Sequence, residues 1–274
     1  MKRIDDNEIK SICIDLLEQF NKLCEENNLA YSIAYGTMLG EVRHGGFIPW
    51  DNDIDVIMPR DDYERLVSLR YREGKYEIKN YRYSSDYYYS FCKMIDKSTI
   101  LIEENRAEHD MGVFIDIFPV DLVSGEDNNY KGVEIVQKIN KAICDSCGSS
   151  NEKKYSKTYI KWIIKRIIKT LFGRKILIRL VDTMCQKTTN RNKGKSRIRF
   201  TNLVYGVYGQ KDIFPYSLWD SIVTVDFDGI KCKMIKNYDY ILSSLYGNYM
   251  ELPPDDKRYS HNILAYHKDD FRND

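Results

Sequence analysis

The sequence predicts an α/β protein with a mixed sheet flanked by helices. Apolar segments that alternate like strands are interleaved with segments of helical periodicity. Several consecutive strands are separated by too few residues for a helical crossover, so we do not expect a wholly parallel sheet. The chain of 274 residues is long enough for one large domain, or for one domain that carries an insertion. We therefore expect a single domain over 1–274.

The composition argues against several classes of protein. The seven cysteines are odd in number and scattered, which indicates reduced thiols in a cytoplasmic protein. Cys144-x-x-Cys147 lacks the second pair of ligands that a zinc site needs. The N-terminus has early acids and no uninterrupted apolar stretch, so we expect no signal peptide. No run of about 18 apolar residues predicts a transmembrane helix.

In the first half of the chain, helices alternate with short strands. Residues 6–28 have apolar side chains at helical spacing behind an aspartate N-cap, Asp5 or Asp6. A buried strand at 30–36 leads through Gly36 into a short helix at 37–43. We also expect a strand at 52–59 stopped by Pro59, a helix at 60–70, strands near 75–81, 88–95 and 99–103, and a strand at 112–121 that ends at a proline.

In the second half, a helix is expected at 128–147 and a charged segment follows it. Residues 153–199 contain sixteen Lys and Arg but one acid, Asp182, whereas the whole chain has a net charge of +1. We interpret 128–200 as a basic helical insertion. After it we expect a hairpin around 227–229, a helix near 238–246 and a polar loop held by two prolines.

Within the basic segment, residues 159–172 read as an amphipathic helix with isoleucines on one face and basic residues on the other. One interpretation is a helix packed on the core with a solvated basic face. The alternative is a helix that lies in a membrane interface and is attracted to anionic lipid. Nucleic-acid binding would use the same charge, but the segment has few aromatic residues, so we expect no nucleic-acid partner.

The segment "WDNDIDVIMP", 50–59, places acids at every second position. Side chains alternate across a strand, so Asp53 and Asp55 point to one face while their apolar neighbours point to the other. Two carboxylates at close range repel each other, and a hard divalent cation would neutralise them. Oxygen ligands of this kind suit Mg²⁺ or Mn²⁺. The other interpretation is a solvated strand face at a sheet edge.

Two further features favour phosphate chemistry at this strand. "YGTMLG" puts the free N–H groups of a helix N-terminus directly after a strand, which is a ready anion site. In "VFIDIFPVD", Asp116 is an acid among apolar residues and would be costly to bury without a partner. We expect Asp116 to complete the metal site of Asp53 and Asp55, although an arginine partner would also explain it. Asp121 is expected to start a turn.

Three blocks in this chain resemble the LicD family of phosphotransferases. They are "GTMLGEVRHGGFIPWDNDIDV", "FIDIFPVD" and "YGNYMELPPDDKRYSHN", and they span residues 36–262 in the family's order. The family includes bacterial phosphocholine transferases and the related fukutin proteins, within the nucleotidyltransferase superfamily. That superfamily has Gly or Ser after the first glycine, whereas this chain has Thr37.

The resemblance implies a nucleotidyltransferase-like mixed sheet and a metal-dependent transferase. Such enzymes move a phosphoryl-alcohol unit, for example phosphocholine, from a CDP-linked donor to a hydroxyl of a glycan or lipid-linked glycan. By motif, Asp53, Asp55 and Asp116 would be the catalytic and metal-binding acids, and Gly36 and Thr37 would contact the donor phosphates. The resemblance also implies a location at the inner face of the cell membrane.

Several neighbouring residues are weaker candidates. Asp51 has the parity of Asp53 and could orient Arg43 or bind a metal only through water; we interpret it as an orienting or capping group and not as a direct metal ligand. Arg43, between the two halves of the site, could contact phosphate, and so could Lys93 if it points inward from its strand. Arg258 and His261 belong either to a lid over the acceptor or to a packed loop.

Two rival functions remain open at this stage. One is a nucleotidyltransferase that places NMP from an NTP on a small hydroxylated molecule. The other is a non-catalytic binding protein of the same fold, which would have no reason to keep three converging acids. The sequence does not distinguish choline, glycerol, ribitol and ethanolamine as the alcohol.

Overall fold

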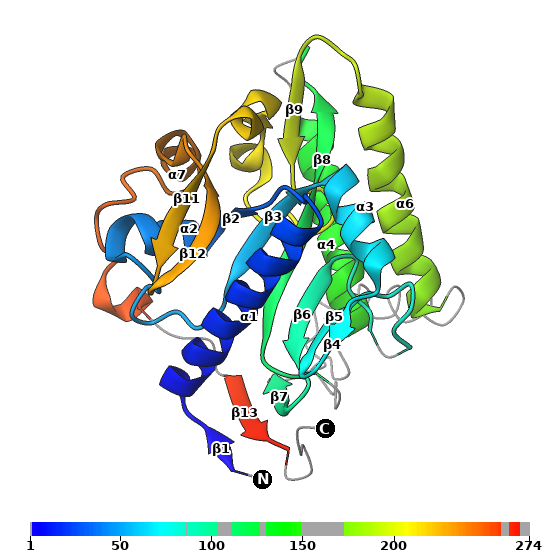
Figure 1. Cartoon of the computed structure of the whole chain (residues 1–274). Coiled ribbons are helices and arrows are strands. Elements are labelled where there is room, and N and C mark those ends of the chain that lie inside the picture. The colour runs from blue at the N-terminus through cyan, green and yellow to red at the C-terminus, as the bar shows by residue number, and fades with distance from the viewer. Residues whose placement is uncertain are drawn as a thin grey trace, which may run out of the picture.

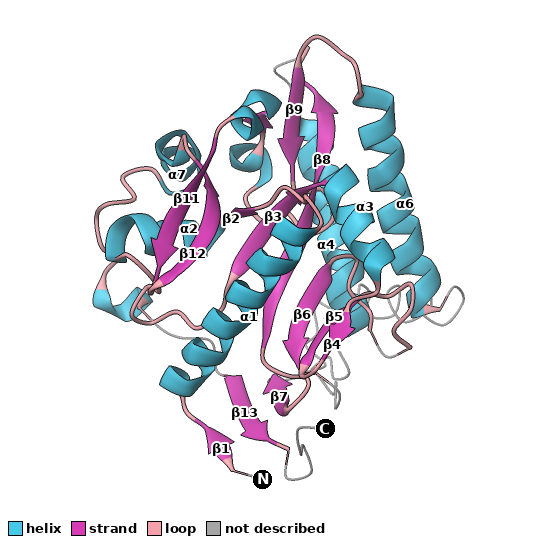
Figure 2. Ribbon diagram, in the orientation of Figure 1, coloured by secondary structure: helices cyan, strands magenta, loops and turns pink. Residues whose placement is uncertain are grey.

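A mixed sheet with helices on both faces forms the centre of the molecule (Figures 1 and 2). The structure is a computed structural model that describes residues 2–85, 87–103, 111–126, 130–148, 173–258 and 263–268. Within these residues the main sheet has eight strands, and both parallel and antiparallel pairs occur in it. The prediction of an α/β fold with a mixed sheet is confirmed.

The longest strand, β8 (Phe114–Ser124), organises the main sheet. It pairs in parallel with β3 (Asp55–Pro59) and antiparallel with β6 (Cys92–Asp96) and β9 (Ile198–Thr201). The remaining strands of the sheet are β2 (Ser32–Ile33), β4 (Arg72–Glu73), β5 (Tyr76–Lys79) and β10 (Phe214–Pro215).

The predicted end of β8 at a proline is wrong. The strand continues through Pro119 to Ser124. Its ladder with β6 ends at Ile117, and its ladder with β9 begins at Asp121. Pro119 falls in the gap between these ladders, where the missing N–H of a proline interrupts neither of them. Asp121, expected to start a turn, is therefore a buried strand residue.

Helix α1 (Asp6–Glu26) lies in front of the sheet in Figure 1, and α4 (Lys131–Gly148) lies behind it. The side chain of Asp5 caps α1 by accepting a hydrogen bond from the N–H of Glu8 at 2.9 Å, as one of the two predicted caps. Helices α3 (Arg60–Leu69) and α6 (Arg174–Asn192) both contact β8. Residues 149–172, with the predicted helix at 159–172, lie outside the described residues.

A second group of elements lies beside β2. The hairpin of β11 (Ile222–Phe227) and β12 (Ile230–Ile235) turns at Asp228 and Gly229, as predicted, and both residues have positive φ. β12 contacts β2, while α2 (Tyr35–His44) and α7 (Tyr238–Tyr246) pack on each other. This group covers the side of the sheet where the acidic strand begins (Figure 1).

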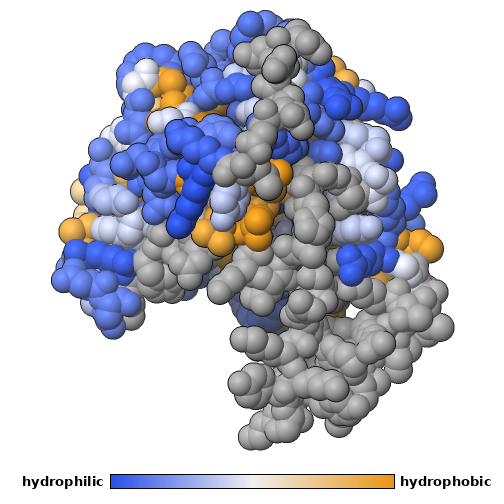
Figure 3. Space-filling model, turned by 90° about the horizontal axis from the view of Figure 1, so that it is seen from below, coloured by the Kyte–Doolittle hydropathy of each residue, from blue (hydrophilic) through white to orange (hydrophobic). Residues whose placement is uncertain are grey.

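A small sheet joins the two ends of the chain. It consists of β1 (Arg3–Ile4), β13 (Ile263–His267) and β7 (Thr99–Glu103), in that order. The strand β13 was not predicted from the sequence. Seen from below the view of Figure 1, the described surface is mainly hydrophilic, with apolar residues in small patches (Figure 3).

Six cysteines whose side chains are described form no disulfide with one another, in agreement with the predicted thiols: Cys13, Cys24, Cys92, Cys144, Cys185 and Cys232 are free and buried. In the described part of the chain, no helix combines the length and the apolar character needed to span a bilayer.

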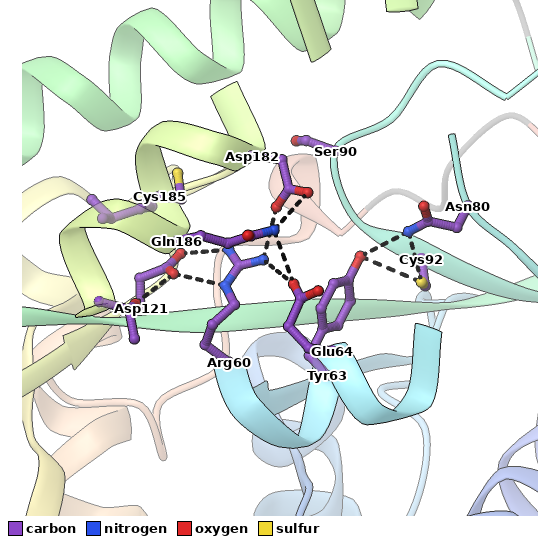
Figure 4. A network of polar contacts seen from close by, with 12 residues as sticks. Arg60, Tyr63, Glu64, Asn80, Ser90, Cys92, Asp121, Asp182, Cys185 and Gln186 are labelled. Atoms are coloured by element: carbon purple, nitrogen blue, oxygen red, sulfur yellow. Dashed lines mark hydrogen bonds and ion pairs between the residues drawn. The ribbon is translucent and has the colours of Figure 1, made fainter. Parts of the chain in front are cut away.

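A buried ionic network fastens α3, β8 and α6 together (Figure 4). The guanidinium of Arg60 donates to both carboxylate oxygens of Asp121 at 2.8 Å and to Asp182 at 2.8 Å. Asp182 also accepts from the hydroxyl of Tyr81 at 2.6 Å and from Arg82. Burial alone would raise the pKa of Asp182, but the charges of Arg60 and Arg82 outweigh it and lower that pKa. The network therefore holds α6, a helix within the basic segment, against the central strand.

We expect Arg60→Met to lower the free energy of unfolding by about 3–5 kcal/mol, because it leaves two buried carboxylates without their shared cation. Arg65→Met, which removes an exposed ion pair with Asp62, should cost less than about 1 kcal/mol. Urea denaturation measures both. Equal losses in the two variants would contradict the structural role of the network.

Candidate functional site

Two of the predicted acids lie side by side on neighbouring strands. Asp55, the first residue of β3, is the register partner of Asp116 on β8. Neighbouring strands are about 4.8 Å apart, so these carboxylates start from adjacent backbone positions. Asp53 precedes the strand, which is shorter than predicted. The expected alternation still holds, since Asp51, Asp53 and Asp55 are partly exposed while Asn52 and Ile54 are buried.

The first turn of α2 is fastened to the start of β3. The hydroxyl of Thr37 accepts a hydrogen bond from the N–H of Asp55 at 2.8 Å, and the N–H of Ala34 donates to the carbonyl of Asp55 at 2.9 Å. The helix starts at Tyr35, two residues earlier than predicted, so Gly36 and Thr37 both lie in its first turn. These bonds set the position of Asp55 relative to the helix N-terminus.

Gly36 leaves room for a carboxylate at this helix end. A Cβ at Gly36 would lie 2.9 Å from Oδ2 of Asp51. The Asp51 carboxylate thus lies against the first turn of α2, where the partial positive charge of the helix N-terminus favours an anion. This position fits the capping role considered for Asp51 rather than the orientation of Arg43, which bonds to the carbonyl of Tyr249. The contact of Gly36 and Thr37 with a donor phosphate stays a prediction.

Lys93 is buried and pairs with Asp116, so the condition set for it in the sequence analysis, an inward position, is met, while its contact with phosphate stays a prediction. The two residues are register partners on β6 and β8, and Nζ of Lys93 lies 2.5 Å from Oδ1 of Asp116. The ammonium also lies 3.2 Å from the centroid of the Phe114 ring, with the Tyr89 and Phe91 rings at 5.1 and 5.5 Å. The buried partner of Asp116 is therefore a lysine within the site. The arginine considered from the sequence belongs to Asp121.

Crowding of like charges dominates the electrostatics of the site. Burial raises the pKa of Asp53 well above its usual range, and the charges of Asp55 and Asp51 raise it further, as does a hydrogen bond with Asp51. The pKa of Asp55 is also raised, by burial and then by the charges of Asp116 and Asp51, while Lys93 opposes the shift. The acids therefore retain protons to a higher pH than ordinary aspartates do.

The possible ligand atoms on this face are carboxylate oxygens, which suit a hard divalent cation. In the part of the chain that the structure describes, no group of three or more His, Cys, Asp or Glu side chains converges into a ready metal site. The ion pair with Lys93 engages one oxygen of Asp116. The raised pKa values of Asp53 and Asp55 nevertheless indicate an unbalanced negative charge that a cation would relieve. A metal on Asp53, Asp55 and Asp116 stays a prediction.

The structure does not bring Arg43 to the acids. It lies in the last turn of α2, about 10 Å along the helix from Gly36. Its guanidinium donates to the carbonyl of Tyr249 at 2.9 Å. Arg258 lies over the ring of Trp50 at 5.3 Å and donates to the carbonyl of Pro253, so it belongs to a packed loop. His261 lies outside the described residues, and phosphate contact by Arg43 stays a prediction.

The sequence analysis missed the aromatic residues beside the acids. Phe118 follows Asp116 by two residues on β8 and so lies on the same face. Tyr35 contacts Phe118 edge-on, and Tyr208 stacks on Tyr35 with ring centroids 5.7 Å apart. Tyr246 in turn meets Tyr208. The repeated Tyr-Gly in "VYGVYG", 204–209, was the one available signal.

Comparisons with known proteins agree with the resemblance. The sequence model of the family described as LicD/FKTN/FKRP, nucleotidyltransferase domain, matches residues 28–162. The lipopolysaccharide cholinephosphotransferase LicD of Haemophilus influenzae is 30% identical over 275 residues, which cover 96% of this chain and 98% of that protein. Two uncharacterized proteins, RP689 of Rickettsia prowazekii and RT0683 of Rickettsia typhi, are 37% and 35% identical over 33% and 29% of this chain, and over 33% and 27% of their own lengths.

We expect the protein in EDTA to lose thermal stability as the pH rises above about 4, the usual pKa of an aspartate in an unfolded chain. Folding raises the pKa of Asp53 and Asp55, so the protonated acids favour the folded state. This stabilisation is lost as the pH rises through the pKa values of the folded protein. Asp53→Asn and Asp55→Asn should flatten the decline, and Mn²⁺ should reduce it in the parent. Melting temperatures from pH 4 to 8 test this, with Asp62→Asn as the control. A decline that stays unchanged in Asp53→Asn would contradict it.

Proposed function

Because this chain belongs to the LicD family, we propose that it is a phosphotransferase that moves a phosphoryl-alcohol unit from a CDP-linked donor to a glycan hydroxyl. Phosphocholine is the unit named for the Haemophilus relative, and lipopolysaccharide is the acceptor named for it. The proposed acceptor here is a cell-surface glycan precursor. The observation that carries the proposal is the register pairing of Asp55 with Asp116, beside Asp53 and the N-terminus of α2.

This arrangement suits attack on a diphosphate. The N–H groups in the first turn of α2 can orient phosphate oxygens, because the helix N-terminus favours anions. Asp53, Asp55 and Asp116 would hold a Mg²⁺ or Mn²⁺ ion, which would neutralise charge on the donor. Thr37 keeps Asp55 in place through its hydrogen bond to the backbone N–H. Catalysis in such a site comes mainly from positioning and charge neutralisation.

The bonds change as follows in the proposed reaction. The acceptor oxygen attacks the donor phosphorus distal to the nucleoside, and an O–P bond to the glycan forms. The bond from that phosphorus to the bridging oxygen breaks, so CMP leaves with the bridging oxygen. Asp116 takes the proton of the acceptor hydroxyl, and its contact with the Lys93 ammonium holds the carboxylate in place.

A nucleotidyltransferase is the second candidate, because the matching family is described as a nucleotidyltransferase domain. In that reaction the phosphorus next to the nucleoside of an NTP is attacked, and pyrophosphate leaves. Incubation with CDP-choline and, separately, with NTPs distinguishes the two reactions by the release of CMP or of pyrophosphate. Absence of both products, together with no calorimetric binding of Mg²⁺ or Mn²⁺, would favour a non-catalytic binding protein.

We also propose that the protein acts at the inner face of the cell membrane, bound to anionic lipid. Along α6, whose residues are all described, the exposed charged side chains are all basic: Lys175, Arg179, Lys187 and Arg191. The same helix exposes more than half of each of three apolar side chains, Ile176, Leu180 and Met184. Exposed basic and apolar groups on one helix are complementary to an anionic lipid surface. The sequence of 149–172 adds seven Lys and Arg and one acid.

We expect Asp53→Ala and Asp55→Ala to abolish CMP release from CDP-choline while the fold persists. Each change removes a proposed metal ligand and also relieves like-charge repulsion. In EDTA both variants should melt no lower than the parent, but they should lose the rise in melting temperature that Mn²⁺ gives the parent. Near-parental turnover in either alanine variant would refute the assignment.

Asp116→Asn should lower turnover by at least about 10²-fold, as expected for loss of a general base.

For the membrane, we expect Lys175→Glu, Arg179→Glu and Lys187→Glu together to abolish binding to phosphatidylglycerol vesicles at moderate salt, since each basic group contributes about 1 kcal/mol. Activity on a soluble acceptor should persist, and phosphatidylcholine vesicles serve as the control. Leu180→Asp should weaken vesicle binding without lowering the melting temperature. A parent that ignores anionic vesicles, with an unstable Leu180→Asp variant, would show instead that another part of the chain covers this face.

A further inference from the structure

Three tyrosines from distant parts of the chain line the acidic face. Tyr35 begins α2, Tyr208 precedes the 3-10 helix η1 (Gly209–Asp212), and Tyr246 ends α7. Tyr35 and Tyr208 stack with an interplanar angle of 22°, whereas Tyr208 and Tyr246 meet at 84° with centroids 5.6 Å apart. We call these three residues the tyrosine wall. It presents two ring orientations, one nearly perpendicular to the other.

The tyrosine wall lies within electrostatic reach of the acids. Burial raises the pKa of all three tyrosines, and the charge of Asp55 contributes to the shift in each. All three side chains remain partly exposed. Tyr35 touches Phe118, which shares its face of β8 with Asp116. The wall is therefore continuous with the place where the donor diphosphate is proposed to bind.

The hydroxyl groups of the wall are engaged within the protein. The hydroxyls of Tyr208 and Tyr246 are 2.9 Å apart, and the hydroxyl of Tyr35 donates to Oδ2 of buried Asp212 at 3.3 Å. Tyr35 also adopts a φ of +49°, which is costly for a bulky residue and indicates that its surroundings hold it in place. What the wall offers a ligand is mainly ring surface in fixed orientations.

We propose that Tyr35, Tyr208 and Tyr246 bind the alcohol headgroup of the donor and select a quaternary ammonium over a primary ammonium or a polyol. This inference rests on the proposed transfer from a CDP-linked donor. A trimethylammonium group has no N–H to donate, so it gains little from hydrogen-bond acceptors. It is attracted to the faces of aromatic rings and to nearby negative charge. A polyol would need hydrogen-bonding partners that the engaged hydroxyls supply poorly.

A second feature of the same site shows that the fold stabilises a cation in this way. The Lys93 ammonium lies among the rings of Phe114, Tyr89 and Phe91, with the Asp116 carboxylate as its counter-ion. Aromatic rings and a carboxylate thus surround one cation already. The tyrosine wall, with Asp55 nearby, offers the same combination of rings and negative charge on a partly exposed surface, without a lysine of its own in the described contacts.

Competition binding measures the selection directly. The dissociation constants of CDP-choline, CDP-ethanolamine and CDP-glycerol are measured with Mn²⁺ for the parent and for Tyr208→Leu and Tyr246→Leu. The parent should bind CDP-choline about tenfold tighter than CDP-ethanolamine, because the N–H groups of a primary ammonium would lose water without gaining acceptors at the ring faces. Each leucine variant should lose most of this preference and leave CDP-glycerol binding within about twofold. Tyr208→Phe should keep the preference, because the ring remains.

Tyr240→Leu is the matched control, since Tyr240 is an exposed tyrosine on the same helix as Tyr246. Melting curves identify variants that fail to fold, and Tyr246→Leu then replaces Tyr208→Leu as the decisive variant. Equal weakening of CDP-choline and CDP-glycerol, or no preference in the parent, would overturn the inference while CMP release from CDP-choline still supported the proposed function. A parent that transfers from no CDP-alcohol would overturn both.

Discussion

Mutual repulsion of carboxylates on one side of the sheet is the constraint around which the site is built. Besides burial, the charges of Asp51 and Asp116 raise the pKa of both Asp53 and Asp55, and the charge of Asp55 also raises that of Asp53. The parallel register of β3 and β8 forces Asp55 and Asp116 together at backbone level, so the side chains cannot escape by a shift of one residue without exposing the apolar alternates. Gly36 and the N-terminus of α2 accommodate Asp51, and Lys93 neutralises part of the charge of Asp116. Gly36 and Lys93 thus both accommodate the crowded acids, Gly36 by leaving space and Lys93 by supplying positive charge.

The same repulsion explains how the fold can build a site suited to binding a cation. Folding energy from the core holds the acids in place, and their raised pKa values show that the charge is not balanced by the protein alone. Added positive charge at this site would relieve the repulsion. Lys93 neutralises part of this negative charge, because its ammonium pairs with Asp116. The side chain of Lys93 is buried, and its ammonium lies over the ring of Phe114.

Features that depend on local sequence patterns were predicted correctly. Features that depend on contacts between distant segments were missed. Strand alternation placed Asp53 and Asp55 on one face, and an isolated acid in an apolar strand marked Asp116 as a site residue. The same reasoning failed for Asp121, whose partner Arg60 lies 61 residues earlier in the chain. Pro119 misled the prediction because nothing local reveals that two ladders meet beside it. The tyrosine wall was invisible for the same reason, since 177 residues separate Tyr35 from Asp212, the carboxylate that anchors it.

The buried ionic network connects these observations at the level of the whole fold. Arg60 follows β3 directly, Asp121 lies on β8 beyond Asp116, and Asp182 lies on α6. The network therefore ties together, at their far ends, the two strands that carry the acids. The Thr37 hydroxyl fixes the acidic end of this parallel pair, and Arg60 fixes the other end. Because Asp182 brings α6 into the same network, the helix with the basic and apolar surface is rigidly coupled to the strands of the site. A surface that bound α6 would thereby also fix the orientation of the acids relative to that surface.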